Sequence, residues 1–457
     1  MNAWFPRLTM HSLVIVISVL TYVLTTRIGE ERRPPSIAIA WVLGLIAIPY
    51  LALPTYLLFG RRKLQRKPCP PGIRSRGKHW AEELIESFGL PPAAPSRVRL
   101  HSDAGESSAA LFEIMASAES RLDICTYILG NDEFGRRAVD QMIESAQRGV
   151  RVRLLIDGYG AIQVRRSSFK RLRLGGVETA TFSPFFARRT ANPRNLRDHR
   201  KLVVADGAWL WAGGRNLAAE YFTGRNGALP WRDLTFDLQG LAAHSAAGQF
   251  ETDWTASGGA RDAPAGIAAP ASIAAFPASG GRTQFLPSGP DQSEDTVHAL
   301  LIDACFRVEQ RMLVVTPYFV PDVSLETAMR LAARRGVKID LVIPATSNHR
   351  LADFARSRAL RALSDAGVYV HLLPYMIHAK GVVFDSSLGL SGSVNLDSRS
   401  LLLNYECAVV FYGAQEIEWL ASWIQALIPD SQRFEAHAPG LWRDLCEGLL
   451  LTVAFQL

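Results

Sequence analysis

Two long apolar stretches open the chain, before any alternation of helices and strands begins. The first covers roughly residues 8–26 (LTMHSLVIVISVLTYVLTT) and the second roughly 37–59 (IAIAWVLGLIAIPYLALPTYLLF). Each is long enough to cross a hydrocarbon core of about 30 Å. The first has neither the charged start nor the small-residue cleavage site of a secretory signal. We therefore expect an N-terminal transmembrane helical hairpin over residues 1–60.

After Trp80 the pattern changes, and stretches of helical periodicity alternate with short β-branched runs. RVRLLI at 151–156 and KIDLVI at 338–343 are such runs, and each follows a helical stretch ending in Arg-Gly-Val. Between them, residues 256–281 are rich in Ala, Gly, Pro and Ser, which is typical of a linker. The pattern predicts an α/β protein with two similar halves, 98–255 and 284–430, a linker at 256–283, and a C-terminal apolar helix within 431–457.

Basic residues gather directly after the second apolar stretch. Residues 61–80 (RRKLQRKPCPPGIRSRGKHW) hold eight Lys or Arg and no acid, in a chain whose formal net charge is +7. Such a run attracts anionic lipid headgroups or nucleic acid, or it is a solvated linker that sets topology. We expect residues 61–97 to be a basic membrane-proximal linker. The larger basic excess on this side predicts a cytoplasmic catalytic part.

The five cysteines form no pattern that indicates a covalent or metal-binding framework. The five residues are scattered without a CxxC pair, which disfavours a disulfide framework or a structural zinc site. A catalytic part in a reducing compartment is consistent with this pattern.

One motif occurs twice, once in each half. HRKLVVADGAWLWAGGRN begins at His199 and HAKGVVFDSSLGLSGSVN begins at His378. Each fixed position of the first copy recurs 179 positions later, and one such match arises by chance roughly one time in twenty. The repeat is therefore not accidental. Its candidate site residues are His199, Lys201, Asp206 and Asn216 in the first copy, and His378, Lys380, Asp385 and Asn395 in the second.

The spacing within the motif indicates a phosphate site. Residues i and i+2 of a strand point to the same face, so each histidine projects with its lysine. The glycine that follows allows close approach of a bound group, and the asparagine can donate its amide to an oxyanion. Two facing copies give two imidazoles, two ammonium groups and two amides around one pocket. One histidine would attack phosphorus while the other protonates the leaving oxygen.

Two other interpretations of the motif carry less weight. Incidental surface residues would not recur at a constant offset. A metal site is disfavoured because lysine is a poor ligand at neutral pH and the carboxylates have the wrong spacing. We therefore expect no metal.

The motif and several longer strings resemble one known family. HxKx4Dx6G[GS]xN in two copies is the signature of the phospholipase D superfamily, and within it the chain resembles the bacterial cardiolipin synthases. The resemblance covers nearly the whole chain, including the strings RRPPSIAIAWVLGLIAIPYLALPTYLLFGRRKL, RDHRKLVVADG, PWRDLTFDLQG, FETDW, SGPD, TPYFVPD and GSVNLDSRSLLLNYE. It implies two pseudo-repeated phospholipase-D-type α/β/α sandwich domains with mixed sheets, preceded by the transmembrane hairpin.

The resemblance also implies roles for single residues. An acid after each motif orients a catalytic histidine, which carries over to Asp233 and Glu406. Asp206 and Asp385 would then serve structure more than chemistry. His199 would be the nucleophile, and His378 would act as acid and then base. The resemblance implies no organic cofactor.

The implied function is cardiolipin synthesis at the bacterial inner membrane by a multi-pass protein. One phosphatidylglycerol would donate its phosphatidyl group through a phosphohistidine to a second, releasing glycerol. Phosphatidylglycerol, other anionic phospholipids and the membrane would be the partners, and nucleic acid would not. The alternatives are a phospholipase D, a head-group-exchanging phosphatidyltransferase, a nuclease and an inactive membrane-binding scaffold. The oligomeric state is left open.

Overall fold

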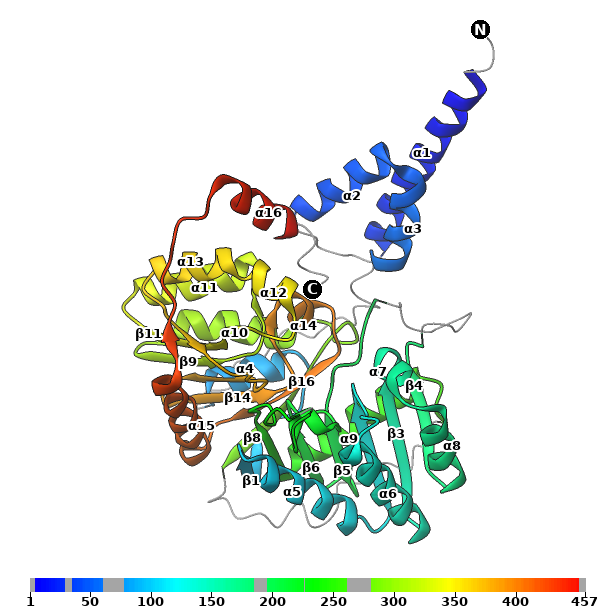
Figure 1. Cartoon of the computed structure of the whole chain (residues 1–457), viewed down its shortest axis with the longest axis vertical. Helices are drawn as coiled ribbons and strands as arrows, with labels where there is room; N and C mark the ends of the chain where they lie inside the picture. The colour runs from blue at the N-terminus through cyan, green and yellow to red at the C-terminus, as the bar shows by residue number, and fades with distance from the viewer. Residues whose placement is uncertain are drawn as a thin grey trace.

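A computed structural model describes residues 5–28, 35–60, 78–184, 195–225, 227–260 and 281–451. These residues form an α/β body from which three N-terminal helices project (Figure 1). One fifteen-stranded sheet runs through both halves of the body. Its strands in the first half are β1 (Ala94–His101), β2 (Arg121–Thr126), β3 (Arg151–Asp157), β4 (Glu178–Phe182), β5 (Leu202–Ala205), β6 (Trp209–Gly213) and β7 (Thr235–Gly240).

The second half repeats this arrangement. Its strands are β8 (Arg282–Ser288), β9 (Arg311–Val315), β11 (Lys338–Pro344), β12 (Tyr369–Leu373), β13 (Gly381–Phe384), β14 (Leu388–Gly392) and β16 (Glu406–Phe411), with β17 (Gln432–Arg433) added at the edge. The first half has the order β1-β7-β6-β5-β2-β3-β4 and the second the equivalent order β8-β16-β14-β13-β9-β11-β12. In each half three strands run parallel and the rest antiparallel. The predicted pair of repeated domains with mixed sheets is confirmed.

The halves join at the first strand of each. β1 pairs with β7 on one side and with β8 on the other, where Ala94 lies opposite Thr283 and Pro95 opposite Arg282. The Oγ atoms of Ser96 and Thr283 lie 2.7 Å apart at this junction. The two sheets thus continue into each other, which sets the relative position of the two motifs.

Helices cover both faces of each half-sheet. In the first half, α5 (Ala104–Ser117), α6 (Glu133–Gln147) and α8 (Arg166–Leu174) pack on one face and α9 (Leu241–Ala256) on the other. In the second half, α10 (Thr296–Arg307), α11 (Val323–Arg334) and α13 (Ser357–Asp365) take the first place and α15 (Ala414–Leu427) the second. Phe250 of α9 and Leu420 of α15 belong to one core cluster that spans both halves.

The repeated Arg-Gly-Val strings are helix ends. Gly149 after α6 and Gly336 after α11 have φ of 94° and 97°, a left-handed conformation that glycine adopts without steric cost. After each of these glycines the chain enters the next parallel strand, which is β3 in the first half and β11 in the second. The similarity noticed in the sequence therefore records the same helix-to-strand connection in both halves.

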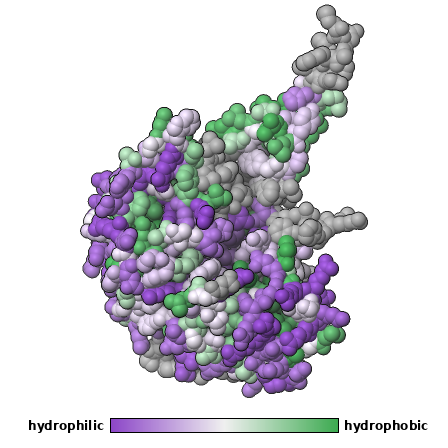
Figure 2. Space-filling model, viewed as in Figure 1, coloured by the Kyte–Doolittle hydropathy of each residue, from purple (hydrophilic) through white to green (hydrophobic). Residues whose placement is uncertain are grey.

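The N-terminal helices differ from the expected hairpin. They are α1 (Phe5–Ile28), α2 (Pro35–Ala47) and α3 (Pro49–Phe59), so the second apolar stretch is broken at Ile48. Ile48 precedes Pro49 and has φ −138° and ψ 59°, because proline disfavours the helical conformation of the residue before it. Within the described residues, no helix meets the combined length and apolarity of a membrane span. Figure 2 shows apolar residues gathered on these projecting helices.

Two expected peripheral segments contain additional structure. Residues 61–77 of the expected basic linker lie outside the described residues, but α4 (Trp80–Ser87) follows them and buries Ala81 and Ile85 in the second half. At the other end, α16 (Leu441–Leu451) is the C-terminal helix. Its Glu447 pairs with Arg361 of α13, while Trp442 is 80% exposed. The tail therefore docks on the second half through a polar contact and leaves an apolar side chain outside.

Candidate active site

The two motif histidines lie where the halves meet. His199 stands three residues before β5 and His378 three residues before β13. The backbone N–H of His199 donates to the carbonyl of Tyr405 at 2.8 Å, and that of His378 donates to the carbonyl of Arg232 at 2.7 Å. Each histidine is therefore tied by its backbone to the opposite half, next to the acid expected from the sequence.

The acids are exchanged between the halves. Glu406 Oε1 lies 2.9 Å from His199 Nδ1, and Asp233 Oδ2 lies 2.8 Å from His378 Nδ1. The acid that follows each motif thus lies beside the histidine of the other half, not beside the histidine of its own motif. The crossed backbone bonds place each acid beside the histidine of the other half. Since each Nδ1 faces a carboxylate, the Nε2 atoms are left for chemistry.

Burial controls the protonation of these groups. Burial, followed by the charge of Lys201, lowers the pKa of His199 to about 4, although Glu406 raises it. Burial and then Lys380 lower the pKa of His378 to about 3, against the opposing effect of Asp233. Burial tends to raise the pKa of Glu406 and Asp233, but the facing imidazoles bring both below their ordinary values. Both rings are thus neutral and both acids ionised near pH 7.

The two lysines lie behind the histidines. Lys201 Nζ donates to the His199 carbonyl at 2.6 Å. Lys380 Nζ donates to the His378 carbonyl and lies 2.8 Å from His378 Nδ1 and 3.1 Å from its Nε2. Burial lowers the pKa of Lys201 to about 8 and that of Lys380 to about 7. An anion brought to these groups would favour their charged forms.

A cavity of about 560 Å³ joins the two halves in front of the histidines. His199 and Asn216 line it from the first half, and His378 and Asn395 line it from the second. The structure therefore brings both histidines and both asparagines to one cavity, as the duplicated motif predicts. Within the described residues, no group of three or more His, Cys, Asp or Glu side chains could hold a metal ion.

The asparagine amides are partly engaged within the protein. Asn216 Nδ2 donates to Tyr221 Oη at 2.8 Å, and its Oδ1 accepts from the backbone of Ile128 at 3.2 Å. Asn395 Nδ2 donates to Ser400 Oγ at 3.1 Å. Each amide group has a second N–H, so each can still donate one bond into the cavity.

The motif aspartates are not part of this cavity. Asp206 accepts hydrogen bonds from the backbone N–H groups of residues 119–121, and Asp385 does the same for residues 309–311. Both lie beyond the far ends of β5 and β13, at φ of 50° and 51°. They lie apart from the histidines and lysines with which the motif groups them, and the structural role that the resemblance implies for them stays a prediction. They fix the turn after each motif strand to the start of β2 or β9.

Both halves that carry the motif match one known family. Residues 111–230 and 301–428 match the family described as "Cardiolipin synthase, PLD-like domain", and residues 13–61 match "Phospholipase_D-nuclease N-terminal". Cardiolipin synthase A of Pseudomonas aeruginosa is 32% identical over 87% of this chain and 85% of its own. The chain belongs to the cardiolipin synthase family of phospholipase D-like proteins. The major cardiolipin synthase ClsA of Bacillus subtilis is 30% identical over 93% of both chains.

Solved structures share the fold of this cardiolipin synthase family member at low identity. Phosphatidylserine synthase of Haemophilus influenzae superposes with a TM-score of 0.62 at 14% identity, over 83% of this chain and 100% of that one. Polyphosphate kinase of Porphyromonas gingivalis gives 0.51 at 13% identity, over 88% and 59%. These similarities concern the fold alone.

Sequence reasoning missed the aromatic and basic side chains around the histidines. Tyr127 meets the His199 ring edge-on with centroids 4.9 Å apart, and Tyr221 meets that of His378 at 5.1 Å. Arg197 and Arg399 line the same cavity. Arg197 lies two residues before the first motif and Arg399 lies in the string GSVNLDSRSLLLNYE, so both were visible as cations but not as neighbours. Tyr127 follows a parallel strand, the edge where α/β sites collect.

Proposed function

We propose that the protein is a phosphatidyltransferase that makes cardiolipin from two phosphatidylglycerol molecules by double displacement at His199 and His378. The observation that carries the proposal is the crossed pair of histidine–carboxylate contacts facing one cavity. Family membership gives the reaction class, because the relatives that match over most of the chain are cardiolipin synthases.

In the first step, His199 Nε2 attacks the phosphorus of one phosphatidylglycerol. The bond from phosphorus to the glycerol headgroup oxygen breaks, and that oxygen takes a proton from His378. Glycerol leaves and the phosphatidyl group stays on His199. The greater exposure of the His199 side chain, 13% against 4% for His378, favours this assignment.

In the second step, a headgroup hydroxyl of another phosphatidylglycerol enters. His378 takes its proton, the hydroxyl oxygen attacks phosphorus, and the bond from phosphorus to His199 breaks. Cardiolipin is released and both rings return to their starting states. Glu406 and Asp233 stabilise whichever imidazole is positively charged, while Asn216 and Asn395 are placed to donate to phosphoryl oxygens.

The negative charge of the substrate explains how His378 can be protonated when it has to act as the acid. With a pKa of about 3, His378 is neutral in the empty site and a poor proton donor. A phosphodiester brings a negative charge into the buried site, which raises the pKa of the nearby imidazole and ammonium groups. Binding of the lipid would therefore charge the acid only when there is a leaving group to protonate.

We also propose that the N-terminal helices attach the enzyme to the bacterial inner membrane, with the catalytic part cytoplasmic. Support comes from the basic excess after residue 60 and from exposed apolar side chains such as Leu20, Leu43 and Leu51. A C-terminal reporter active only in the cytoplasm should give signal. Signal from a periplasm-specific reporter would contradict this orientation.

The decisive experiment for the reaction uses purified full-length enzyme and labelled phosphatidylglycerol. Cardiolipin and free glycerol should form together, and His199→Asn should form neither. Phosphatidate as the main product would instead identify water as the acceptor, which makes the protein a phospholipase D. A headgroup-exchanged lipid in the presence of a second alcohol would identify a broader transferase.

A further inference from the structure

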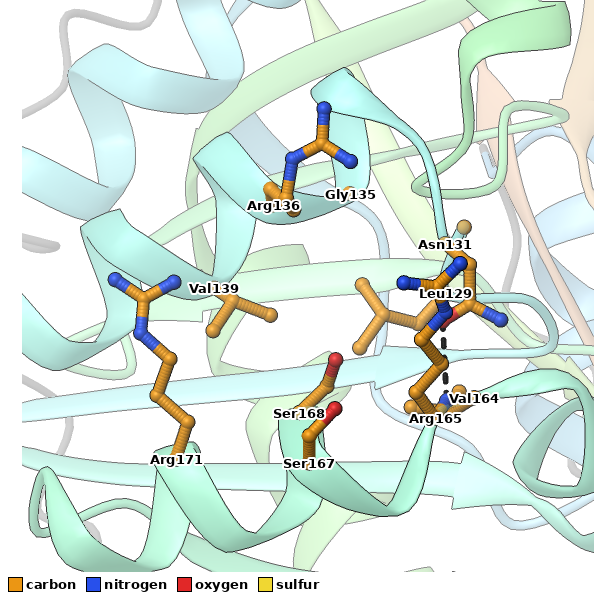
Figure 3. Close-up of a pocket in the computed structure, with 11 residues that line it drawn as sticks. Leu129, Asn131, Gly135, Arg136, Val139, Val164, Arg165, Ser167, Ser168 and Arg171 are labelled. Carbon is orange, nitrogen blue, oxygen red and sulfur yellow. Dashed lines mark hydrogen bonds between the residues drawn. The ribbon is translucent and has the colours of Figure 1, made fainter.

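A second, smaller pocket of about 190 Å³ lies in the first half, between the beginnings of α6 and α8. Its floor is apolar, from Leu129, Val139 and Val164, and its rim is polar (Figure 3). The rim consists of Asn131, Arg136, Arg165, Ser167, Ser168 and Arg171. We call these residues the arginine pocket.

The arginine pocket carries a positive charge that the described structure leaves largely uncompensated. Arg171 pairs with Asp140 at 2.5 Å. The guanidinium groups of Arg136 and Arg165 are exposed and form no ion pair within the described residues. Helix α8 adds further cations and no acid, since its sequence is RSSFKRLRL.

The first turn of α8 contributes two more kinds of donor. Ser167 and Ser168 lie in this turn, and Figure 3 shows their hydroxyl groups facing the space between α6 and α8. The residue that precedes the helix, Arg165, makes no side-chain capping bond. Hydroxyl groups, guanidinium groups and the positive end of a helix all favour a bound oxyanion.

The second half shows what happens at the equivalent helix. α8 and α13 have nine residues each and occupy corresponding places beside β4 and β12. Arg356 precedes α13 as Arg165 precedes α8, but Arg356 is buried and donates to the carbonyls of Pro344 and Ala345.

Helix α13 also has an anion of its own. The fully buried carboxylate of Glu447, from α16, pairs with Arg361 of α13 and lies 3.0 Å from Nε of Arg443. The second half thus covers this helix with a carboxylate from the C-terminal tail. In the first half the described chain places one carboxylate on α8, that of Asp140 on Arg171, while Arg136 and Arg165 at the rim of the arginine pocket have no ion pair among the described residues.

We propose that the arginine pocket is an accessory site for a phosphate group, and that its source is the headgroup of an anionic phospholipid. The guanidinium groups of Arg136 and Arg165 bind the phosphate oxygens, the serine hydroxyls donate to them, and the apolar floor contacts the glycerol carbons. The choice of a lipid as the source rests on the proposed function, whereas the phosphate site itself does not.

The pocket shares a wall with the catalytic cavity. Tyr127 and Ile128 line the cavity while Leu129 and Asn131, next in the chain, line the arginine pocket. Asn131 holds this wall by accepting from the backbone N–H of Arg165 at 3.0 Å and donating to the carbonyl of Gln163, which is itself a cavity residue. A lipid in the arginine pocket would therefore sit one loop away from a lipid under reaction.

The test measures local protection of arginines in the full chain. The His199→Asn variant is reconstituted in phosphatidylcholine bilayers with or without phosphatidylglycerol, so that no turnover is expected. Each preparation is treated with an arginine-selective dicarbonyl reagent, and modification is quantified by mass spectrometry. Phosphatidylglycerol should slow the modification of Arg136 and Arg165 about tenfold, which corresponds to one well-made charged hydrogen-bond site. Arg173, on α8 but not in the pocket, should react at an unchanged rate.

A second arm distinguishes the source of the phosphate, using inorganic phosphate with phosphatidylcholine bilayers alone. Protection by inorganic phosphate equal to that by phosphatidylglycerol supports the phosphate site and contradicts a lipid-specific one. Equal modification of Arg136, Arg165 and Arg173 under all conditions overturns the proposal. A matched pair of double variants checks binding. R136Q/R165Q should weaken association with phosphatidylglycerol bilayers more than R166Q/R173Q. Equal weakening in both double variants would show that only the overall surface charge matters and would contradict the site.

Discussion

Glu406 and His199 are 207 residues apart in the chain, yet the carboxylate and the ring nitrogen Nδ1 lie 2.9 Å apart. The contact crosses from one repeated half to the other, and Asp233 and His378 mirror it. Neither half therefore holds both members of a histidine–carboxylate pair.

This relationship predicts separate effects for two isosteric substitutions. Glu406→Gln should slow formation of the intermediate about a hundredfold, because the amide no longer stabilises a positive charge on His199. Asp233→Asn should slow chiefly the attack of the second lipid by a similar factor, because His378 must then take up a proton without the carboxylate that stabilises its positive charge. Single-turnover kinetics with labelled lipid separates the steps. If Glu406→Gln affected only the steps assigned to His378, the crossed pairing would have no functional meaning.

The nucleophile can be identified by trapping. His378→Asn should accumulate some labelled protein from phosphatidylglycerol, since attack is possible while proton donation is lost. His199→Asn should accumulate none. The measurement is acid-labile, base-stable label on the denatured chain. The reverse pattern would exchange the two roles and leave the shared cavity unchanged.

The dependence of kcat/KM on pH should follow the groups of the free enzyme. Activity should fall below pH about 4, where His199 becomes protonated and is no longer a nucleophile, and above pH about 7, where Lys380 loses its charge. In Lys380→Arg the guanidinium stays charged, so the alkaline fall should move toward the pKa of Lys201, about 8. An alkaline limb that does not move in this variant would assign it to another group.

Asp206→Ala should reduce stability more than catalysis. The substitution removes an acceptor shared by three backbone N–H groups, which costs about 1–3 kcal/mol in the free energy of unfolding. Burial tends to raise the pKa of Asp206, but hydrogen bonds from the Ser120 hydroxyl and from these N–H groups bring it below its ordinary value. Its contribution is therefore present above the unfolded value of about 4 and is lost as pH falls through the lower folded pKa. The difference in chemical denaturation midpoint from the unchanged protein should shrink in acid.

A large loss of turnover in the fully folded Asp206→Ala protein would return this residue to the catalytic group. Asp385→Ala is the matched variant in the second half, because its carboxylate accepts the equivalent bonds.

Much of the architecture could be predicted because the repeated halves have short sequence patterns that depend only on neighbouring residues. The Arg-Gly-Val helix ends, the β-branched strands and the spacing from His199 to Asn216 each depend on neighbours in the chain. What joins the halves depends on contacts between distant strands. The pairing of β1 with β8 and the backbone bond from His199 to Tyr405 produce no periodic pattern in the sequence. The sequence therefore did not predict that each acid lies beside the histidine of the other half.

In the N-terminal region a local signal was present in the sequence, but the hydropathy pattern did not register it. Hydropathy alone predicts one apolar helix over residues 37–59. In the structure the helix is interrupted at Ile48, because Pro49 disfavours the helical conformation of the residue before it. Tyr127 and Tyr221 could not be recognised as site residues because their contacts with the histidine rings are tertiary. The domain boundaries drawn from the sequence and the catalytic roles of single residues stay predictions.

The crossed carboxylates have a consequence during synthesis of the chain on the ribosome. His199 emerges long before Glu406 has been translated, and a histidine without its acid is a weak catalyst for an abundant membrane lipid. On the proposed mechanism, a truncated or unfinished copy would therefore have no complete site with which to cleave phospholipids. Under the proposed mechanism the chain would become active only when its second half has packed onto the first, so that completion of the chain and activation of the enzyme would be one event.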